Sequence, residues 1–373
     1  MDPSLRRGLA GGSRLIALFL ILCFPSCERS LPVTSQVDPR GSVKIGLPEQ
    51  GAYTGAFIDF GGAEDDVALE AIEGFEQMVG KHQAIIASSS FWGEQSFPLA
   101  NLKMIWRHGS LPLVFWSPWD RPYEQRKGPD RFSLKAILAG DWNRYIDDWA
   151  DQARVYGHPM IVSFGDEMNG DWFPWSGIYY GAGKPVPGQP NELEGAEVFK
   201  RAYRYVVDRV RARGANNIQW MFQTNNFSYP WENWNYGPNY YPGSAYVDWL
   251  GLSVYGEQFI EEPWAEFWPL VKWPYEEMER LDPTKPIMIA EWATGEFPTR
   301  GNKAKWIRDA LETIRTRLPR VKAEVYWHER WQNEDQTYSN LRVNSSPEAL
   351  AAYQHGIADP YFLSQLILQP ATR

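Results

Sequence analysis

Residues 286–292 read Pro-Ile-Met-Ile-Ala-Glu-Trp, an apolar run in which an acid comes next to last. Runs that stay apolar until their last positions are typical of strands in a parallel sheet that is covered on both faces. Similar runs recur along the chain at residues 51–60, 84–90, 112–120, 159–169, 218–225, 247–255 and 322–329. We therefore predict eight buried strands.

Helical periodicity fills the segments between these strands. Over 64–79, Ile72, Phe75 and Val79 recur at spacings of three and four residues, behind acids that suit the first turn of a helix. Further helices are expected at 98–109, 135–156, 193–214, 264–282, 301–319 and 346–357. Residues 226–246 are rich in Pro, Asn and aromatic residues and have little helical periodicity, so we expect a loop there.

Strands that alternate with helices form either a closed barrel or an open, doubly wound sheet. Two features favour the barrel. The first strand is not followed by a Gly-rich phosphate-binding turn, and acids and aromatic residues gather at the carboxyl ends of several strands. Those ends converge on one site in a barrel, whereas an open sheet would string them along an edge. We expect a (β/α)8 TIM barrel that forms one domain over residues 45–373.

The first residues are typical of an export signal. Arginines precede an apolar run over 15–24 that is too short to cross a bilayer, so we expect residues 1–27 to be a signal peptide. Its end, Phe24-Pro25-Ser26-Cys27, resembles a bacterial lipobox, in which the cysteine is lipidated. An ordinary cleavage site near Cys27 is the alternative. Residues 28–44 are polar and predict a linker, which places the domain in the cell envelope or outside the cell.

The composition narrows the classes of partner. A net charge of −9 argues against nucleic acid, which needs a positive surface, and suits an uncharged polysaccharide. The 19 Trp, 19 Tyr and 18 Phe indicate clefts lined by flat rings. We expect no cofactor and no metal, because the five histidines are scattered, with no pair at i, i+4 and no cysteine beside them. We expect a monomer, attached to a membrane only if its N-terminus carries a lipid.

Two acids end strands in positions that suggest chemistry. Glu291 ends the seventh strand, and Glu167 follows the fourth in a loop that also holds Trp172 and Trp175, whose flat faces suit sugar rings. Either acid alone is as well explained by a salt bridge at the barrel rim. Together they favour the cleavage of a glycosidic bond with retention, which needs two carboxyl groups about 5–5.5 Å apart.

Residues 167–172 read Glu-Met-Asn-Gly-Asp-Trp, and this run resembles the acid/base motif of glycoside hydrolase family 26, which reads His-Glu-Met-Asn-Gly-x-Trp. The segments 247–255 and 342–350 and the strand of Glu291 are also similar to that family. The resemblance implies that Glu167 is the acid/base and Glu291 the nucleophile. It further implies that Tyr255 hydrogen-bonds the nucleophile and that Trp172 borders the bound sugar, and Asn169 in the same motif is a candidate for substrate binding. Trp327 is the best of the weaker candidates at strand ends, because the last barrel strand in such enzymes often ends with an aromatic platform.

The sequence departs from the family pattern at two positions. The histidine before the acid/base is Asp166 here, and an arginine three residues earlier is Ser163. An ionised Asp166 accepts a hydrogen bond from a sugar hydroxyl but cannot donate one, and it adds negative charge beside Glu167. The exchange either retunes which sugar fits or marks a relative that binds without turnover.

Other residues near strand ends are weaker candidates, each as well explained by packing at the rim: Asp59, Asp120, Asn225 and His328. The cluster 115–120 is a candidate sugar subsite. Trp106, Trp149 and Trp306 fall in helical patterns and are expected in the core.

The resulting hypothesis is a retaining endo-glycoside hydrolase that cuts a β-linked polysaccharide. β-1,4-Mannan is the first expectation, because endo-β-mannanases dominate the family that the chain resembles. Mixed-linkage β-glucan, favoured by Asp166, and xylan are alternatives. The rival from another class is a polysaccharide-binding envelope protein without turnover, against which the presence of both Glu167 and Glu291 speaks.

Overall fold

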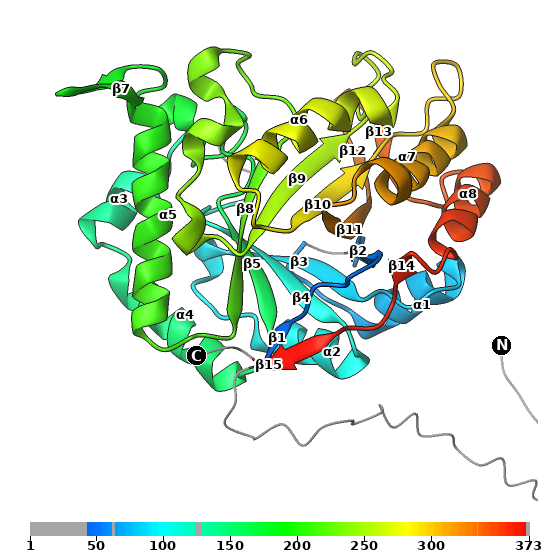
Figure 1. The fold of residues 1–373 in the computed structure, drawn as a ribbon, viewed down its shortest axis with the longest axis horizontal. Helices are drawn as coiled ribbons and strands as arrows, with labels where there is room; N and C mark the ends of the chain where they lie inside the picture. The colour runs from blue at the N-terminus through cyan, green and yellow to red at the C-terminus, as the bar shows by residue number, and fades with distance from the viewer. Residues whose placement is uncertain (1–42, 62–63, 124–127, 334, 371–373) are drawn as a thin grey trace, which may run out of the picture. The chain divides into compact units, whose positions relative to one another are not determined.

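A computed structural model describes residues 43–61, 64–123, 128–333 and 335–370. Eight parallel strands follow one another around a closed sheet, because the last of them, β11, pairs with the first, β2 (Figure 1). The barrel strands are β2 (Ala52–Ile58), β3 (Ile85–Phe91), β4 (Leu111–Ser117), β5 (Met160–Phe164), β8 (Ile218–Asn225), β9 (Trp249–Tyr255), β10 (Ile287–Ala293) and β11 (Val321–His328). The predicted (β/α)8 barrel is confirmed, and each barrel strand lies within two residues of a predicted run at its start.

Helices surround the strands: α1 (Leu69–Val79), α2 (Leu99–His108), α3 (Leu134–Ala139), α4 (Asn143–Tyr156), α5 (Glu194–Ala212), α6 (Phe267–Leu281), α7 (Lys303–Arg317) and α8 (Pro347–Ile357). Two differences from the predicted helices go beyond a shift of up to three residues at one end. The segment 135–156 is broken at Gly140, whose φ of 88° ends α3. The first helix begins at Leu69, so Glu64 lies before it rather than in its first turn.

The segment 226–246 contains no α-helix or strand, as expected, and carries three 3-10 turns, η3 (Asn233–Asn235), η4 (Gly237–Tyr240) and η5 (Ser244–Tyr246). A fourth such turn, η1 (Trp92–Glu94), directly follows β3, and a fifth, η2 (Gly177–Tyr180), lies in the loop after β5. The long connections after β5 and β8 therefore stand at the carboxyl ends of the strands, where a barrel carries its site.

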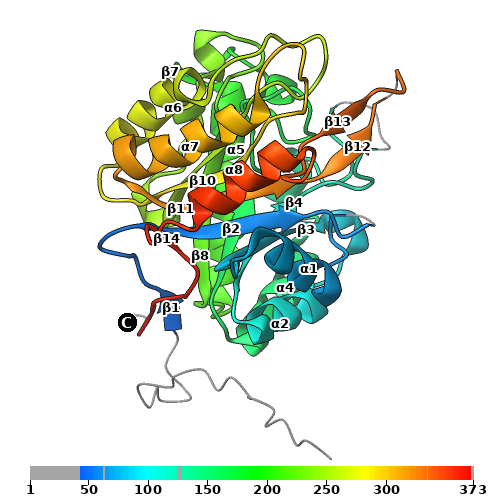
Figure 2. The same cartoon turned by 90° about the vertical axis from the view of Figure 1, so that its right-hand side faces the viewer.

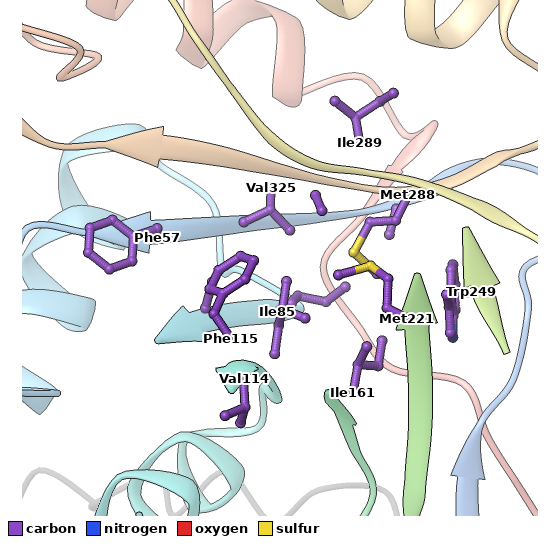
Figure 3. Close-up of a cluster of buried hydrophobic side chains, with 14 of the residues drawn as sticks. Phe57, Ile85, Val114, Phe115, Ile161, Met221, Trp249, Met288, Ile289 and Val325 are labelled. Atoms are coloured by element: carbon purple, nitrogen blue, oxygen red, sulfur yellow. The ribbon is translucent and has the colours of Figure 1, made fainter. Parts of the chain in front are cut away.

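Apolar side chains from the barrel strands fill the barrel interior (Figure 3). Figure 3 shows Met221 and Met288 among the interior side chains, whereas Val114 and Ile289 point away from them, because successive residues of a strand face opposite sides. Phe57 and Phe115 lie at one end of this cluster and Trp249 at the other (Figure 3). The barrel is thus a packed core, and its working surface is confined to its ends.

Trp149 and Trp306 are buried in the core as expected, and Trp106 is partly buried against it. These rings are therefore part of the packing around the barrel.

Short strands lie at both ends of the barrel. β1 (Val43–Ile45) pairs with β15 (Leu368–Pro370), and the backbone N–H of Ile45 donates to Gln219 at the start of β8. At the opposite end, β12 (Arg330–Gln332) and β13 (Tyr338–Asn340) form a projecting hairpin (Figure 2). The other short strands are β6 (Pro185–Val186), β7 (Gln189–Leu193) and β14 (Phe362–Leu363).

The predicted signal peptide over 1–27, with Cys27, lies outside the described residues, as does most of the linker over 28–44. Residues 43 and 44 correct that linker boundary, because they belong to β1 and are held by backbone pairing with β15. Within the described part of the chain, no helix has both the length and the apolar character needed to cross a bilayer.

Candidate active site

Glu291 and Glu167 lie at the carboxyl ends of different barrel strands. Glu291 is inside β10, and Glu167 follows β5 by three residues. Each is 7 % exposed, so both carboxyl groups are nearly buried but not sealed from solvent. Glu167 has a φ of 52°, in the left-handed region that side chains other than Gly rarely adopt. Such strain is characteristic of functional sites, where the surrounding structure holds the residue in place.

Backbone hydrogen bonds hold Glu167 in this turn. Its N–H donates to the carbonyl of Gln223 on β8 over 3.0 Å, and its carbonyl accepts from the N–H of Gly170 over 2.8 Å. Position 170 requires a glycine, because a Cβ there would lie 2.5 Å from the ring of Trp172. The indole folds back over this glycine, and Nε1 of Trp172 donates to Oε2 of Glu167 over 2.8 Å. The Glu-to-Trp motif thus forms one compact unit.

Glu291 receives a hydrogen bond on each carboxylate oxygen. The hydroxyl of Tyr255, at the end of β9, donates to Oε2 over 2.7 Å, the contact that the family resemblance implied. Nε2 of Gln223 donates to Oε1, also over 2.7 Å. Two donors on one carboxylate stabilise its charged form, which is the form that a nucleophile requires.

Gln223 also connects the two acids. Its Nε2 donates to the hydroxyl oxygen of Ser253 over 2.9 Å, and Ser253 in turn hydrogen-bonds Glu167. The hydroxyl of Ser163 donates to Oε1 of Gln223 over 3.0 Å. Because Ser163 occupies the amide oxygen, the amide nitrogen must face Glu291 and Ser253. Sequence reasoning missed Gln223 and Ser253, since an uncharged polar residue inside an apolar strand carries no sign of which neighbour it meets.

Burial is the main influence on the charge of the site. It raises the pKa of Glu167, against the lowering effect of hydrogen bonds from Ser253 and Trp172. It also raises the pKa of Glu291 well above the usual range, and the nearby carboxyls of Glu167 and Asp166 raise it further. Carboxyl groups this close resist ionising together, so the site retains a proton more readily than separate acids would.

Asp166 is a third buried acid beside this pair. It is 5 % exposed, and burial, followed by the charge of Glu167, raises its pKa well above the usual range. Its Oδ1 has no hydrogen-bond partner in the described part of the chain. Asp166 lines a small cavity that is partly open to solvent, together with Glu64, Phe115, Trp119, Glu291 and Trp327. An unpaired buried oxygen in a cavity wall suits an acceptor for a ligand hydroxyl.

Aromatic side chains shape this cavity. Trp327, at the end of β11, is 8 % exposed, stacks on Phe57 with ring centroids 3.9 Å apart, and donates from Nε1 to Glu329 over 2.7 Å. Phe115 meets the edge of Trp327. A larger hollow, beside Trp142 and Asp148 near α4, shares no residue with this cavity and contains neither Glu167 nor Glu291.

Trp175 does not offer a flat face to a ligand, and the expectation for it is wrong. It is 1 % exposed, stacks on Phe173 and donates from Nε1 to the carbonyl of Asp166 over 2.6 Å. The indole therefore packs beneath the loop and fixes the backbone of Asp166. Trp172, only half-buried, is the tryptophan of this pair that borders the acids.

Asn169 also has its hydrogen-bonding capacity used within the protein. It is 1 % exposed, and its Nδ2 donates to the carbonyl of Asn225 and to Oγ of Ser228, over 3.0 and 3.3 Å. Its Oδ1 accepts from the backbone N–H of Asn225 over 2.9 Å. These contacts tie the loop of Glu167 to the end of β8. The structure thus differs from the expectation of a substrate ligand, because both N–H groups of the amide are already engaged.

The weaker rim candidates are likewise engaged by protein groups. Asp59 pairs with Arg342, and Asp120 pairs with Arg131 over 2.7 Å. His328 is buried, its Nδ1 accepts from the backbone N–H of Val343, and burial lowers its pKa to about 3. From the cluster 115–120, Phe115, Ser117 and Trp119 line the cavity.

The model of glycosyl hydrolase family 26 matches residues 132–308, a range that holds both Glu167 and Glu291. Endoglucanase H of Acetivibrio thermocellus is 31% identical over 294 residues, covering 77% of this chain and 29% of that protein. A mannan endo-1,4-beta-mannosidase of Bacillus subtilis is 30% identical over 199 residues, 52% of this chain and 45% of that protein. The chain thus spans less than half the length of either relative.

Solved structures share the fold. The catalytic domain of a GH26 endo-beta-1,4-mannanase from Bacillus sp. JAMB-750 superposes with a TM-score of 0.62 and 20% identity, covering 84% of this chain and 87% of that one. At 20% identity, this structural similarity shows the barrel fold only.

Proposed function

Because the chain carries a glycosyl hydrolase family 26 domain, we propose that it cleaves a β-linked polysaccharide internally and with retention of configuration. Glu291 is the nucleophile and Glu167 the acid/base. The observation that carries this proposal is the unequal support of the two acids. Glu291 accepts hydrogen bonds from Tyr255 and Gln223 on separate oxygens, whereas Glu167 lies in a strained turn beside the half-buried Trp172.

In the first step, a carboxylate oxygen of Glu291 attacks the anomeric carbon while Glu167 gives its proton to the leaving glycosidic oxygen. The bond between the anomeric carbon and that oxygen breaks, and the sugar becomes an ester of Glu291. In the second step, Glu167 takes a proton from water, whose oxygen attacks the anomeric carbon and frees Glu291. Burial raises the pKa of Glu167, which favours the acid form that the first step needs.

In this proposal Glu291 reacts as the carboxylate, and its hydrogen bonds oppose the rise in its pKa that burial causes. Tyr255 and Gln223 both favour the charged form of Glu291. When Glu291 forms the ester bond to the sugar, it loses its negative charge and no longer repels a charge on Glu167. Glu167 therefore gives its proton to the leaving oxygen more easily. Trp172 and Ser253 then stabilise the carboxylate that remains on Glu167.

The substrate that we propose first is β-1,4-mannan, in line with the mannan endo-1,4-beta-mannosidase relative. Mixed-linkage β-glucan is the second candidate. Two observations favour it: the longer match, to Endoglucanase H, and the unpaired oxygen of Asp166, an acceptor where the family has a donor. Neither candidate needs a cofactor, because both steps use only carboxyl groups and water.

One variant tests the mechanism. Glu291→Ala should abolish hydrolysis of aryl β-glycosides, and added azide should restore turnover by entering the vacated face and giving a glycosyl azide of inverted configuration. Glu312→Gln, an exposed acid on α7, is the matched control and should keep full activity. Full activity in Glu291→Ala would refute the nucleophile.

A polysaccharide panel tests turnover and substrate together. The purified chain is incubated with mannan, mixed-linkage β-glucan, xylan and cellulose, and new reducing ends are measured. We expect release from one or more of the first three. Binding without release on every polymer would favour the polysaccharide-binding envelope protein instead.

We also propose that residues 1–27 direct export and that the domain works as a monomer in the envelope or outside the cell. The basic start and the apolar run over 15–24 support export, and Cys27 is the position for a lipid. Mass spectrometry of the mature N-terminus distinguishes a lipidated Cys27 from ordinary cleavage.

A further inference from the structure

Three side chains far from the acids meet at the amino-terminal end of the barrel. Glu76 lies in the last turn of α1, His82 in the connection from α1 to β3, and His108 is the last residue of α2, three residues before β4. They therefore sit where β3 and β4 begin, whereas Glu167 and Glu291 sit where strands end. In barrel enzymes the amino-terminal face serves stability rather than catalysis.

The nitrogens and oxygens of this trio face one another. Nδ1 of His82 lies 2.8 Å from Oε1 of Glu76, and Nε2 of His108 lies 3.0 Å from Oε2 of the same carboxylate. All the ligand atoms fall within 4.8 Å of one another, and the two imidazole rings are 5.1 Å apart. Atoms that bind one zinc ion in a tetrahedron are about 3.3 Å apart, given metal–ligand bonds of about 2.0–2.1 Å. Binding would therefore draw the ligand atoms closer together than they lie in the unbound protein.

The surroundings favour a cation here. The backbone N–H of Gln83 donates to Oε1 of Glu76 over 2.8 Å and orients the carboxylate, as outer groups do around metal ligands. Glu73, one turn before, adds negative charge near His108. The side chains of His82, His108 and Glu76 are 23%, 14% and 14% exposed to solvent. An ion therefore has access to them, and water can complete its coordination.

We propose that Glu76, His82 and His108 bind one divalent transition-metal ion, with zinc as the first expectation. Two imidazoles and a carboxylate are borderline donors that suit zinc, copper, nickel and cobalt better than magnesium or calcium. The ion joins the end of α1 to the end of α2 and leaves one coordination position to water. It stabilises the fold and takes no part in bond cleavage.

Metal binding tests this proposal without any measure of activity. The full chain is stripped with a chelator and titrated with Zn²⁺ alone by calorimetry, and with Co²⁺ as a visible-absorption probe. We expect one equivalent to bind and the thermal midpoint of unfolding to rise with Zn²⁺. His82→Asn/His108→Asn should lose both effects, and Glu76→Gln should bind more weakly by about tenfold or more. His355→Asn, an exposed histidine on α8, is the matched control.

Two results would overturn the site: a wild-type chain that binds no Zn²⁺ at micromolar concentrations, or a double variant that binds as tightly as wild type. Cys23 and Cys27 are identical in every variant, so ions held by thiols would survive in the double variant and count against the proposal. Circular dichroism of the stripped proteins verifies folding. If the double variant does not fold, His108→Gln alone replaces it, with the same loss expected.

Discussion

Gln223 donates a hydrogen bond from Nε2 to Oε1 of Glu291 over 2.7 Å. The same nitrogen contacts Ser253, and the amide oxygen is occupied by Ser163, so the orientation of the amide is determined from both ends. This relationship makes Gln223 a positioning residue for the proposed nucleophile. It also gives Ser163 a function at a position where the family often has arginine.

Gln223→Leu should lower kcat by about tenfold to a hundredfold, because a hydrogen bond to a charged group contributes about 1.5–3 kcal/mol. The loss should appear in kcat more than in KM, since Gln223 contacts Glu291 and is itself 1 % exposed. Steady-state kinetics on a soluble polysaccharide measure both constants. An unchanged kcat in a folded variant would remove Gln223 from the mechanism.

Glu167→Ala should separate the two roles of an acid/base. Substrates with poor leaving groups need its proton, so polysaccharide hydrolysis should fall by about 10²–10⁴-fold. Aryl glycosides with activated leaving groups should still form the ester with Glu291, and azide should then yield a product of retained configuration. Product analysis by NMR decides the configuration. An inverted azide here would exchange the proposed roles of Glu167 and Glu291.

Asp166→Asn should move the acidic limb of the pH profile of kcat/KM to lower pH. The charge of Asp166 raises the pKa of Glu291, so its removal lets Glu291 ionise at lower pH. Rates measured across the acidic range on one substrate give the midpoint. A limb that stays in place would mean that Asp166 is neutral throughout that range.

Glu324→Gln should stabilise the protein above neutral pH. Glu324 is buried on the face of β11 that is turned toward the helices, where burial raises its pKa from 4.5 to about 7, against hydrogen bonds from Thr54 and Trp292. The fold therefore favours the neutral acid: this contribution is full below pH 4.5 and is lost as the pH rises through about 7. The loss is on the order of 3 kcal/mol, at about 1.4 kcal/mol for each pH unit.

Glutamine suits the site of Glu324, because its oxygen accepts from Trp292 and its nitrogen donates to Thr54. Chemical denaturation at pH 5 and pH 8 should give a smaller difference in unfolding free energy for Glu324→Gln than for wild type. Glu312→Gln supplies the baseline for an exposed acid. Equal pH dependence in wild type and Glu324→Gln would contradict the raised pKa.

The barrel was predictable because its strands are short apolar runs, such as the strand of Glu291. Helical segments separate these runs regularly, and few topologies fit such an alternation. The two acids were placed correctly at strand ends for the same reason. Side-chain direction was not predictable: Trp175 and Trp172 are three residues apart, yet one packs under the loop and the other reaches Glu167.

Contacts between residues far apart in the chain could not be predicted from the sequence either. His108 follows Glu76 by 32 positions, and only the fold brings these two side chains together. Gln223 faces Glu291 across two strand pairings, from β8 through β9 to β10. Patterns of hydrophobicity record which elements form, but they carry little information about which polar atoms meet.

At Glu167, the left-handed backbone conformation lowers the stability of the fold, whereas the proposed reaction needs the glutamate side chain. Glycine would relieve the backbone strain at a φ of 52° and would remove a buried acid beside Glu291, so Glu167→Gly should unfold at a higher temperature than wild type while losing catalysis. Mutations selected for stability alone would therefore tend to remove this glutamate. Keeping Glu167 therefore costs stability, and the proposed acid/base role accounts for that cost.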